Sequence, residues 1–205
     1  GEQVAFFDNG TPAERSTYTD GKRTGTWTQY YDDGKPRTVT TYVNDVEDGP
    51  FTAFTADGKK DREGKYVKGV QEGSWYEYNT DGSILIEFLY KNGQLAKSKK
   101  ENGTFKEYYP SEQPKSEYTY KNGKREGRFV EYFDNGHWVE KPTQLGPAGN
   151  AVSAPERVLE GQGIQREGTY KNDMLDGEVK EYDEKGRVLS VTRYAAGVAQ
   201  TKAAP

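Results

Sequence analysis

The residues able to carry out catalysis are few in this chain. His137 is its one histidine and cysteine is absent, so neither a Cys/His pair nor a thiolate metal site can be built. A Ser-His-Asp arrangement would depend on His137 alone, inside an irregular part of the chain. Aspartates and glutamates often fall at turn positions, where hydrogen bonding to the backbone explains them. We therefore expect no enzyme activity, no cofactor and no bound metal.

Paired carboxylates can also support glycosidase chemistry. Glutamates recur beside a repeated tyrosine, at Glu77, Glu107, Glu131 and Glu181. This regular recurrence favours a row of solvated strand residues over an active site. The glycine-rich segment 161–168 lacks the GxGxxG spacing and the following helix of a nucleotide-binding loop, so it adds little.

A basic segment, YKNGKREG at residues 120–127, has the composition of a phosphate or nucleic-acid contact. Its tyrosine and two glycines recur as Tyr66, Gly69 and Gly73, so they belong to a repeated turn. Lys124, Arg125 and Arg128 remain as candidate contacts. The net charge of −4 argues against a dedicated nucleic-acid binder, whose basic surplus would normally show in the total.

The elements that position these residues form an internal repeat. A glycine two residues before an aromatic residue or valine recurs at Gly25, Gly49, Gly73, Gly103, Gly127 and Gly177. The spacing is 24 residues except for the intervals ending at Gly103 and Gly177, which contain extra residues. Asn-Gly and Asp-Gly pairs between the repeated positions favour tight hairpin turns. Each unit is therefore predicted to be one β-hairpin plus the turn into the next.

Two aromatic columns accompany the glycines, and we predict that both are structural. Their members are Tyr18, Trp27, Tyr42, Phe51, Tyr66, Trp75, Tyr90, Phe105, Tyr120, Phe129, Tyr170 and Tyr194. A further column, which contains Tyr30, lies three residues after Trp27. A regular strand directs such positions to opposite faces, whereas a β-bulge would bring them together. The sequence leaves both alternatives open.

The predicted fold is all-β, a single-layer antiparallel β-meander or solenoid of about seven 24-residue hairpin repeats that form a twisted ribbon. We expect one repeat domain over residues 1–197, with an insertion at 137–167, and a frayed C-terminal tail at 198–205. The insertion is rich in proline and glycine, and both a functional segment and a tolerated expansion fit it.

The pattern GxWxxYxxDG followed by YxxGxxxG, seen at residues 25–34 and 66–73, resembles the MORN-variant repeat of bacterial proteins, which are often grouped as YwqK-type antitoxins. The resemblance covers the chain from Phe6 to Gly197. The missing turn glycine at Glu112 and the insertion are departures from it. It implies a β-solenoid scaffold for protein binding, similar to bacterial immunity proteins that neutralise secreted toxins. The shared residues are architectural, so no active site is implied.

Repeat scaffolds bind through positions that vary between units, and Tyr, Trp and Arg often anchor interfaces. The candidate partner-binding residues are Tyr31, Tyr76, Tyr109, Lys124, Arg125, Arg128, Phe133, His137 and Trp138. The aromatic ones also fit a structural role at an end of the array or against the insertion.

The function expected from these observations is a non-enzymatic, protein-binding scaffold. We expect an immunity protein or antitoxin that binds and occludes a secreted bacterial toxin. The alternatives are a scaffold or phospholipid-contacting MORN protein at the cell envelope, and a carbohydrate-binding wall protein. Membrane contact would need a removed anchor or weak lipid binding. A start without methionine and a high Tyr and Thr content favour the periplasm or cell envelope over the cytoplasm.

Overall fold

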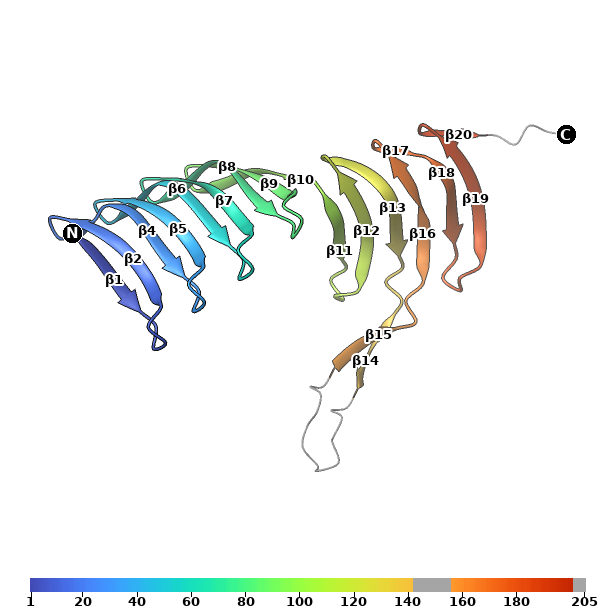
Figure 1. Ribbon diagram of the computed structural model, residues 1–205. Helices are drawn as coiled ribbons and strands as arrows, with labels where there is room; N and C mark the ends of the chain where they lie inside the picture. Colours follow the sequence, from blue (N-terminus) through green and yellow to red (C-terminus); the bar gives the residue numbers. More distant parts are fainter. Residues whose placement is uncertain (142–155, 201–205) are drawn as a thin grey trace, which may run out of the picture. The chain divides into compact units, whose positions relative to one another are not determined.

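The computed structural model describes residues 1–141 and 156–200, and every regular element in these ranges is a β-strand (Figure 1). The strands form antiparallel sheets of consecutive hairpins, so the predicted all-β meander is confirmed. No helix of the described part is long and apolar enough to span a membrane. Contacts divide the chain into two compact units, residues 1–103 and residues 104–205.

Unit 1 is a single sheet in which nearly every strand pairs with its neighbours in the chain. Its strands are β1 (Glu2–Phe6), β2 (Pro12–Thr19), β3 (Lys22–Arg23), β4 (Gly25–Tyr30), β5 (Pro36–Val43), β6 (Val46–Phe54), β7 (Lys60–Val67), β8 (Val70–Tyr78), β9 (Ile84–Lys91) and β10 (Gln94–Lys100). The short β3 pairs only with β2, and β4 is the next strand of the sheet beside β2.

Unit 2 repeats this arrangement around an interruption. Its strands are β11 (Gly103–Tyr108), β12 (Pro114–Lys121), β13 (Lys124–Tyr132), β14 (His137–Lys141), β15 (Glu156–Glu160), β16 (Ile164–Lys171), β17 (Met174–Leu175), β18 (Gly177–Tyr182), β19 (Val188–Ala195) and β20 (Val198–Gln200). β13 pairs directly with β16, while β14 and β15 form a separate two-stranded sheet. The insertion therefore leaves the pairing of the repeat intact.

The structure refines the limits expected for the insertion and the tail. Residues 164–167, placed in the insertion by the sequence, begin β16, and residues 198–200 of the expected tail pair with β19. Residues 142–155 and 201–205 lie outside the described part. In a repeat array each repeat contacts only its neighbours, so a division into two units by contacts is compatible with one array. One domain over residues 1–197 therefore stays a prediction.

One face of each sheet carries edge-to-face aromatic pairs. Each pair joins the ring after a repeat glycine to the tyrosine of the following strand: Trp27–Tyr42 (5.6 Å between ring centroids), Phe51–Tyr66 (5.8 Å), Trp75–Tyr90 (6.1 Å) and Phe105–Tyr120 (5.6 Å). Such geometry adds to the burial of the rings. Trp75 is fully buried, with no exposed surface, and the other buried hydrophobic residues of the described part are Tyr42, Phe129, Val130 and Val179.

The opposite face carries the column that contains Tyr30. On its β9 side, β8 is regular from Trp75 to Glu77, and the register shift beside Tyr78 places the additional residue in β9. On its β7 side, β8 carries additional residues only up to Trp75, opposite Gly64. Alternation along β8 therefore points the two rings to opposite faces. Tyr78 donates a hydrogen bond to Glu63, and the same arrangement recurs in unit 2 between Tyr182 and Glu167. The face opposite the aromatic pairs thus carries repeated tyrosine–glutamate hydrogen bonds.

Candidate functional site

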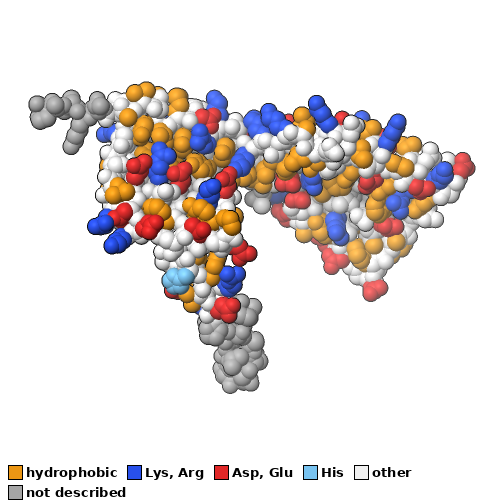
Figure 2. Space-filling model, turned by 180° about the vertical axis from the view of Figure 1, so that it is seen from behind, with side chains coloured by type: hydrophobic (Ala, Val, Ile, Leu, Met, Phe, Trp, Pro, Cys, Tyr) orange, Lys and Arg blue, Asp and Glu red, His pale blue; other side chains and the backbone are white. Residues whose placement is uncertain are grey.

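The hairpin of β14 and β15 is the largest departure from the repeat, and it extends beyond the ends of β13 and β16 (Figure 1). Its register pairs His137 with Glu160 and Trp138 with Leu159. His137 is exposed, whereas Trp138 and Leu159 are half-buried. Figure 2 shows the histidine, in pale blue, at the surface of the hairpin. The His137 side chain is therefore open to solvent, whereas Trp138 and Leu159 are partly covered.

Two glutamine side chains fix the base of the hairpin. Gln113 is buried, its Oε1 accepts a hydrogen bond from Gly136 N (2.8 Å), and its Nε2 donates to Gly136 O (2.9 Å). Gln162 Nε2 donates to Pro114 O (2.7 Å) and to Phe133 O (2.8 Å). Satisfied buried amides hold backbone segments in one arrangement. The base is thus rigidly joined to the preceding turn.

A second set of contacts holds the Trp138 face against that turn. Trp138 Nε1 donates to Ser111 O (3.1 Å), and the Arg157 guanidinium lies 4.8 Å from the Trp138 ring centroid. Arg157 Nη1 is 3.3 Å from Glu112 Oε2. Glu112 replaces the turn glycine and has a φ of 65°, in the left-handed region that disfavours residues with a Cβ.

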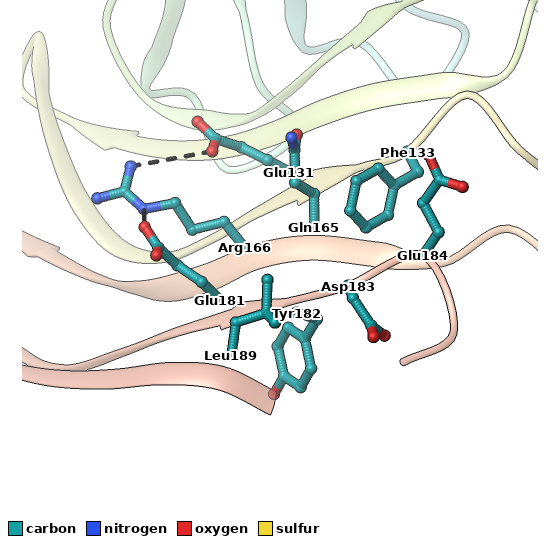
Figure 3. A pocket seen from close by; sticks show the side chains of 9 residues that line it. All are labelled: Glu131, Phe133, Gln165, Arg166, Glu181, Tyr182, Asp183, Glu184 and Leu189. Atoms are coloured by element: carbon teal, nitrogen blue, oxygen red, sulfur yellow. Dashed lines mark ion pairs between the residues drawn. The ribbon is translucent and has the colours of Figure 1, made fainter. Parts of the chain in front are cut away.

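A pocket of about 530 Å³ lies in unit 2 next to the hairpin base (Figure 3). Its lining residues are Glu131, Phe133, Gln165, Arg166, Glu181, Tyr182, Asp183, Glu184 and Leu189. Asn135 links the pocket to the hairpin, because its Oδ1 accepts from Gly163 N (2.9 Å) and its Nδ2 donates to Glu184 O (3.5 Å).

Charged side chains determine the electrostatics of this pocket. Arg166 lies between Glu131 (3.9 Å) and Glu181 (3.7 Å), as the dashed lines of Figure 3 show. Hydrogen bonds from the backbone and side chain of Arg187 lower the pKa of Asp183 below its usual value. Asp183 is therefore held in its ionised form near neutral pH. In the described part of the chain, no group of three His, Cys, Asp or Glu is placed to hold a metal ion.

Four of the predicted contacts gather at this end of unit 2. Phe133 lines the pocket, His137 and Trp138 begin the hairpin, and Tyr109 stands at the turn that the hairpin contacts. The Tyr109 hydroxyl donates to Tyr132 O (2.7 Å), so this residue also has a role within the array.

Tyr31 and Tyr76 lie in unit 1. The Tyr31 hydroxyl donates to Phe54 O at 2.7 Å, the same bond that Tyr109 makes in unit 2. Tyr76 stands on β8 and is half-buried. The structure therefore does not bring these two residues to the hairpin.

Of the three predicted cations, Lys124 and Arg125 begin β13 and Arg128 lies at its middle, whereas the hairpin follows its other end. The Arg125 guanidinium is 4.2 Å from the Tyr170 ring centroid, and Arg128 pairs with Glu167 at 2.9 Å. Arg125 and Arg128 thus stabilise contacts within unit 2, and Lys124 is exposed.

Sequence reasoning did not identify Gln113, Arg157, Gln162 or Arg166. The replacement of glycine by Glu112 was visible as an irregularity, and a change at a turn that precedes an insertion is a signal that the two contact each other. Gln113 and Gln162 carried no signal, because long-range bonds from amides to the backbone leave no pattern in one sequence.

The similarity of this chain to known proteins lies in its repeats. The family model described as MORN repeat variant matches residues 23–44, 71–92 and 101–122. Each matched segment contains one aromatic pair of the core, Trp27–Tyr42, Trp75–Tyr90 or Phe105–Tyr120. No curated protein matches the chain.

The solved structures that are similar to this chain include the wild-type TCP10 domain of Danio rerio CPAP in complex with a peptide of Danio rerio STIL. The identity is 17%, the alignment covers 95% of this chain and 100% of that chain, and the TM-score is 0.26. A likeness at this score does not bear on function. The three matched segments support a repeat protein that contains MORN-variant units.

Proposed function

We propose that this chain is a non-enzymatic scaffold that binds another protein through the hairpin of β14 and β15 and the adjoining end of unit 2. The observation that carries the proposal is the anchoring of a hairpin that the repeat does not need. β13 pairs with β16 without it, yet Gln113, Gln162 and Arg157 hold its base and one face in place. An isolated two-stranded hairpin is only marginally stable in water. The anchoring contacts hold this one in a defined conformation, as a surface that binds a partner protein requires.

The side chains of the hairpin suit a protein partner. His137, Glu140 and Arg157 are exposed, and an Arg stacked on a Trp is typical of interface anchors. A preorganised surface loses less conformational entropy on binding than a mobile loop does. The hairpin is therefore proposed as the main contact.

The partner that we propose is a secreted bacterial toxin, which the scaffold would occlude as an immunity protein. The likeness to MORN-variant repeats supports this proposal. The cell envelope or periplasm is the proposed location, and the mechanism is coverage of the toxin's active site. Tyr31, Tyr76 and Lys124 remain proposed as secondary contacts.

A deletion variant tests the contact sharply. Removal of residues 138–163 joins His137 to Ile164, just as Lys35 leads into Pro36 in the regular turn after β4. We expect the variant to keep its sheet structure by circular dichroism and to lose complex formation with a toxin encoded beside its gene. The full chain should rescue cells that express the toxin and should form a complex with it on gel filtration. Co-expression without rescue or complex would contradict the proposal.

Contact with phospholipid is a second candidate, favoured by strand β10. Leu95 is 53% exposed, and Lys97 and Lys99 on the same strand are also exposed. Basic residues near an anionic bilayer contribute about 1 kcal/mol each. Flotation with vesicles of anionic lipid would reveal salt-sensitive binding, and Lys97→Glu together with Lys99→Glu should abolish it. The deletion of residues 138–163 should leave lipid binding unchanged.

A further inference from the structure

The pocket beside the hairpin combines apolar walls with a surplus of negative charge (Figure 3). Phe133, Tyr182 and Leu189 supply the apolar walls, and Leu189 is 67% exposed. A volume of about 530 Å³ falls within the usual range for ligand sites. The pocket is therefore large enough for one or two side chains of a bound segment.

The charges of the lining do not cancel. Its carboxylates are Glu131, Glu181, Asp183 and Glu184, and its one cationic member is Arg166. Arg187 Nε pairs with Asp183 at 2.6 Å, which neutralises a second carboxylate. Glu184 has no side-chain partner among the residues that the structure describes. Two of the four negative charges thus remain without a cation.

Arg166 does not saturate the carboxylates that flank it. Its distances to Glu131 (3.9 Å) and Glu181 (3.7 Å) exceed hydrogen-bond length, and its buried Nε makes no hydrogen bond. Glu181 accepts one hydrogen bond from Ser190 Oγ (3.0 Å) and is 52% exposed. Its remaining oxygen sites can accept hydrogen bonds from a second cation.

We propose that this pocket binds a lysine or arginine side chain of the partner protein, with an apolar neighbour of that residue against Phe133 and Leu189. The inference rests on the proposed function and specifies the chemistry of the partner. Glu181 and Glu184 supply charge-assisted hydrogen bonds, and the face of Phe133 offers a cation–π contact. The same surplus of carboxylates repels phosphates and acidic peptides.

The experiment uses two peptides as probes, acetyl-Leu-Arg-Leu-amide and acetyl-Leu-Glu-Leu-amide, titrated into the ¹⁵N-labelled full chain. The basic peptide should produce saturable shifts at the amides of Gln165, Asp183 and Glu184, and its affinity should fall at least threefold on raising the salt concentration from 0.05 to 0.3 M, about the range over which exposed charges become screened. The acidic peptide should produce none. Equal shifts from both peptides, or shifts confined to other residues, would overturn the proposal.

Matched variants test the charges. Glu181→Gln with Glu184→Gln should weaken binding of the basic peptide by about tenfold, which corresponds to the loss of charge-assisted hydrogen bonds. Asp8→Asn with Asp61→Asn changes the net charge equally at exposed positions of unit 1, outside the pocket and the hairpin, and should leave binding unchanged. Leu189→Ser, a separate change of the apolar wall, should also weaken binding. Unchanged affinity in the first and third variants would overturn the assignment.

The two proposals can fail independently. If the pocket variants bind the toxin as the native chain does, while deletion of residues 138–163 abolishes the complex, the pocket assignment is wrong and the hairpin contact stands. If the basic peptide binds the pocket but no toxin complex forms, the pocket assignment stands and the proposed function is wrong.

Discussion

Arg157 Nη1 lies 3.3 Å from Glu112 Oε2, and this ion pair joins the two departures from the repeat. Glu112 holds a left-handed backbone where other units have glycine, which costs about 1–2 kcal/mol for a residue with a Cβ. Both side chains are more than half exposed, so the pair contributes at most about 1 kcal/mol. Glu112 therefore does not improve its turn, and we expect its side chain to hold the hairpin through Arg157.

Replacing Glu112 by glycine separates these two effects. Glu112→Gly relieves the left-handed strain and removes the contact with Arg157. We expect the free energy of unfolding of the chain to change by less than about 1 kcal/mol, because gain and loss offset each other. The amides of residues 137–141 should exchange faster with solvent, as hydrogen-exchange mass spectrometry would measure.

The reverse change at a regular turn is the control. Gly34 has a φ of 84° and nothing near its Cβ position, so Gly34→Glu adds the strain without a partner. It should lower the free energy of unfolding by about 1–2 kcal/mol and leave exchange in the hairpin unchanged. Slower exchange at residues 137–141 in Glu112→Gly would contradict the role given to the ion pair.

Gly64 is the position of the core where size is most strictly limited. A Cβ there would lie 2.1 Å from Trp75 Cδ2, and Trp75 is fully buried. Gly64→Ala must displace the indole, so we expect a loss of about 3 kcal/mol or more, at the upper end of overpacking costs. Urea unfolding followed by circular dichroism would measure it.

A glycine with free space around it provides the comparison. Gly10 has a φ of 82° and no atom within 4 Å of its Cβ position. Gly10→Ala should therefore cost only the conformational strain, about 1 kcal/mol. If Gly64→Ala cost no more than Gly10→Ala, the close approach of Trp75 to β7 would not limit the stability of unit 1.

Trp27 and Tyr42 illustrate how much of the fold could be predicted. Their 24-residue recurrence and the glycines between them specify hairpins in chain order, because each unit repeats one local pattern of turns and aromatic residues. The face of each ring could not be assigned. The face depends on which strand holds the additional residue of the bulge between Trp75 and Tyr78. That residue lies in the partner strand β9. Pairing register of this kind is a property of two strands together.

The candidate site was predicted less completely. His137, Trp138 and Phe133 were found because an aromatic residue or histidine outside the repeat columns stands out. Tyr109 was found for the same reason, but its bond to Tyr132 O gives it a structural role as well. The pocket could not be inferred from the sequence. Arg166 has the same repeat position as Arg62, whose guanidinium lies against the Trp75 ring in unit 1, so this position indicates a structural role for Arg166 and gives no sign of a pocket.

Tyr31 and Tyr109 allow the structural role to be measured in each unit. Tyr31→Phe and Tyr109→Phe each leave a carbonyl, that of Phe54 or Tyr132, without its hydrogen bond. We expect each variant to lose about 0.5–1.5 kcal/mol in the free energy of unfolding. Complex formation with the partner should weaken more in Tyr109→Phe than in Tyr31→Phe, because Tyr31 is proposed only as a secondary contact and lies in the unit without the hairpin. An equal effect of both on binding would contradict this difference.

Tyr78 provides a prediction of how stability depends on pH. Burial and the hydrogen bond to Glu63 raise the pKa of Tyr78 to about 12, from an ordinary value of 10. A raised pKa in the folded state gives a contribution to stability that is complete below pH 10 and is lost as pH rises towards 12. We expect the contribution to be on the order of 1–2 kcal/mol, after allowance for partial exposure.

Unfolding by urea between pH 9 and pH 12 would test this contribution. Tyr78→Phe should lower stability below pH 10 and should lose less stability than the native chain as pH rises, because its ring has no proton to lose. Tyr108→Phe is the control, since Tyr108 is 58% exposed, and it should follow the native curve. On the acid side, Lys60 and Tyr78 lower the pKa of Glu63, so its contribution is present above its unfolded pKa and is lost as pH falls through the folded value. Parallel curves for Tyr78→Phe and the native chain above pH 10 would show that the pair of Tyr78 and Glu63 does not control alkaline stability.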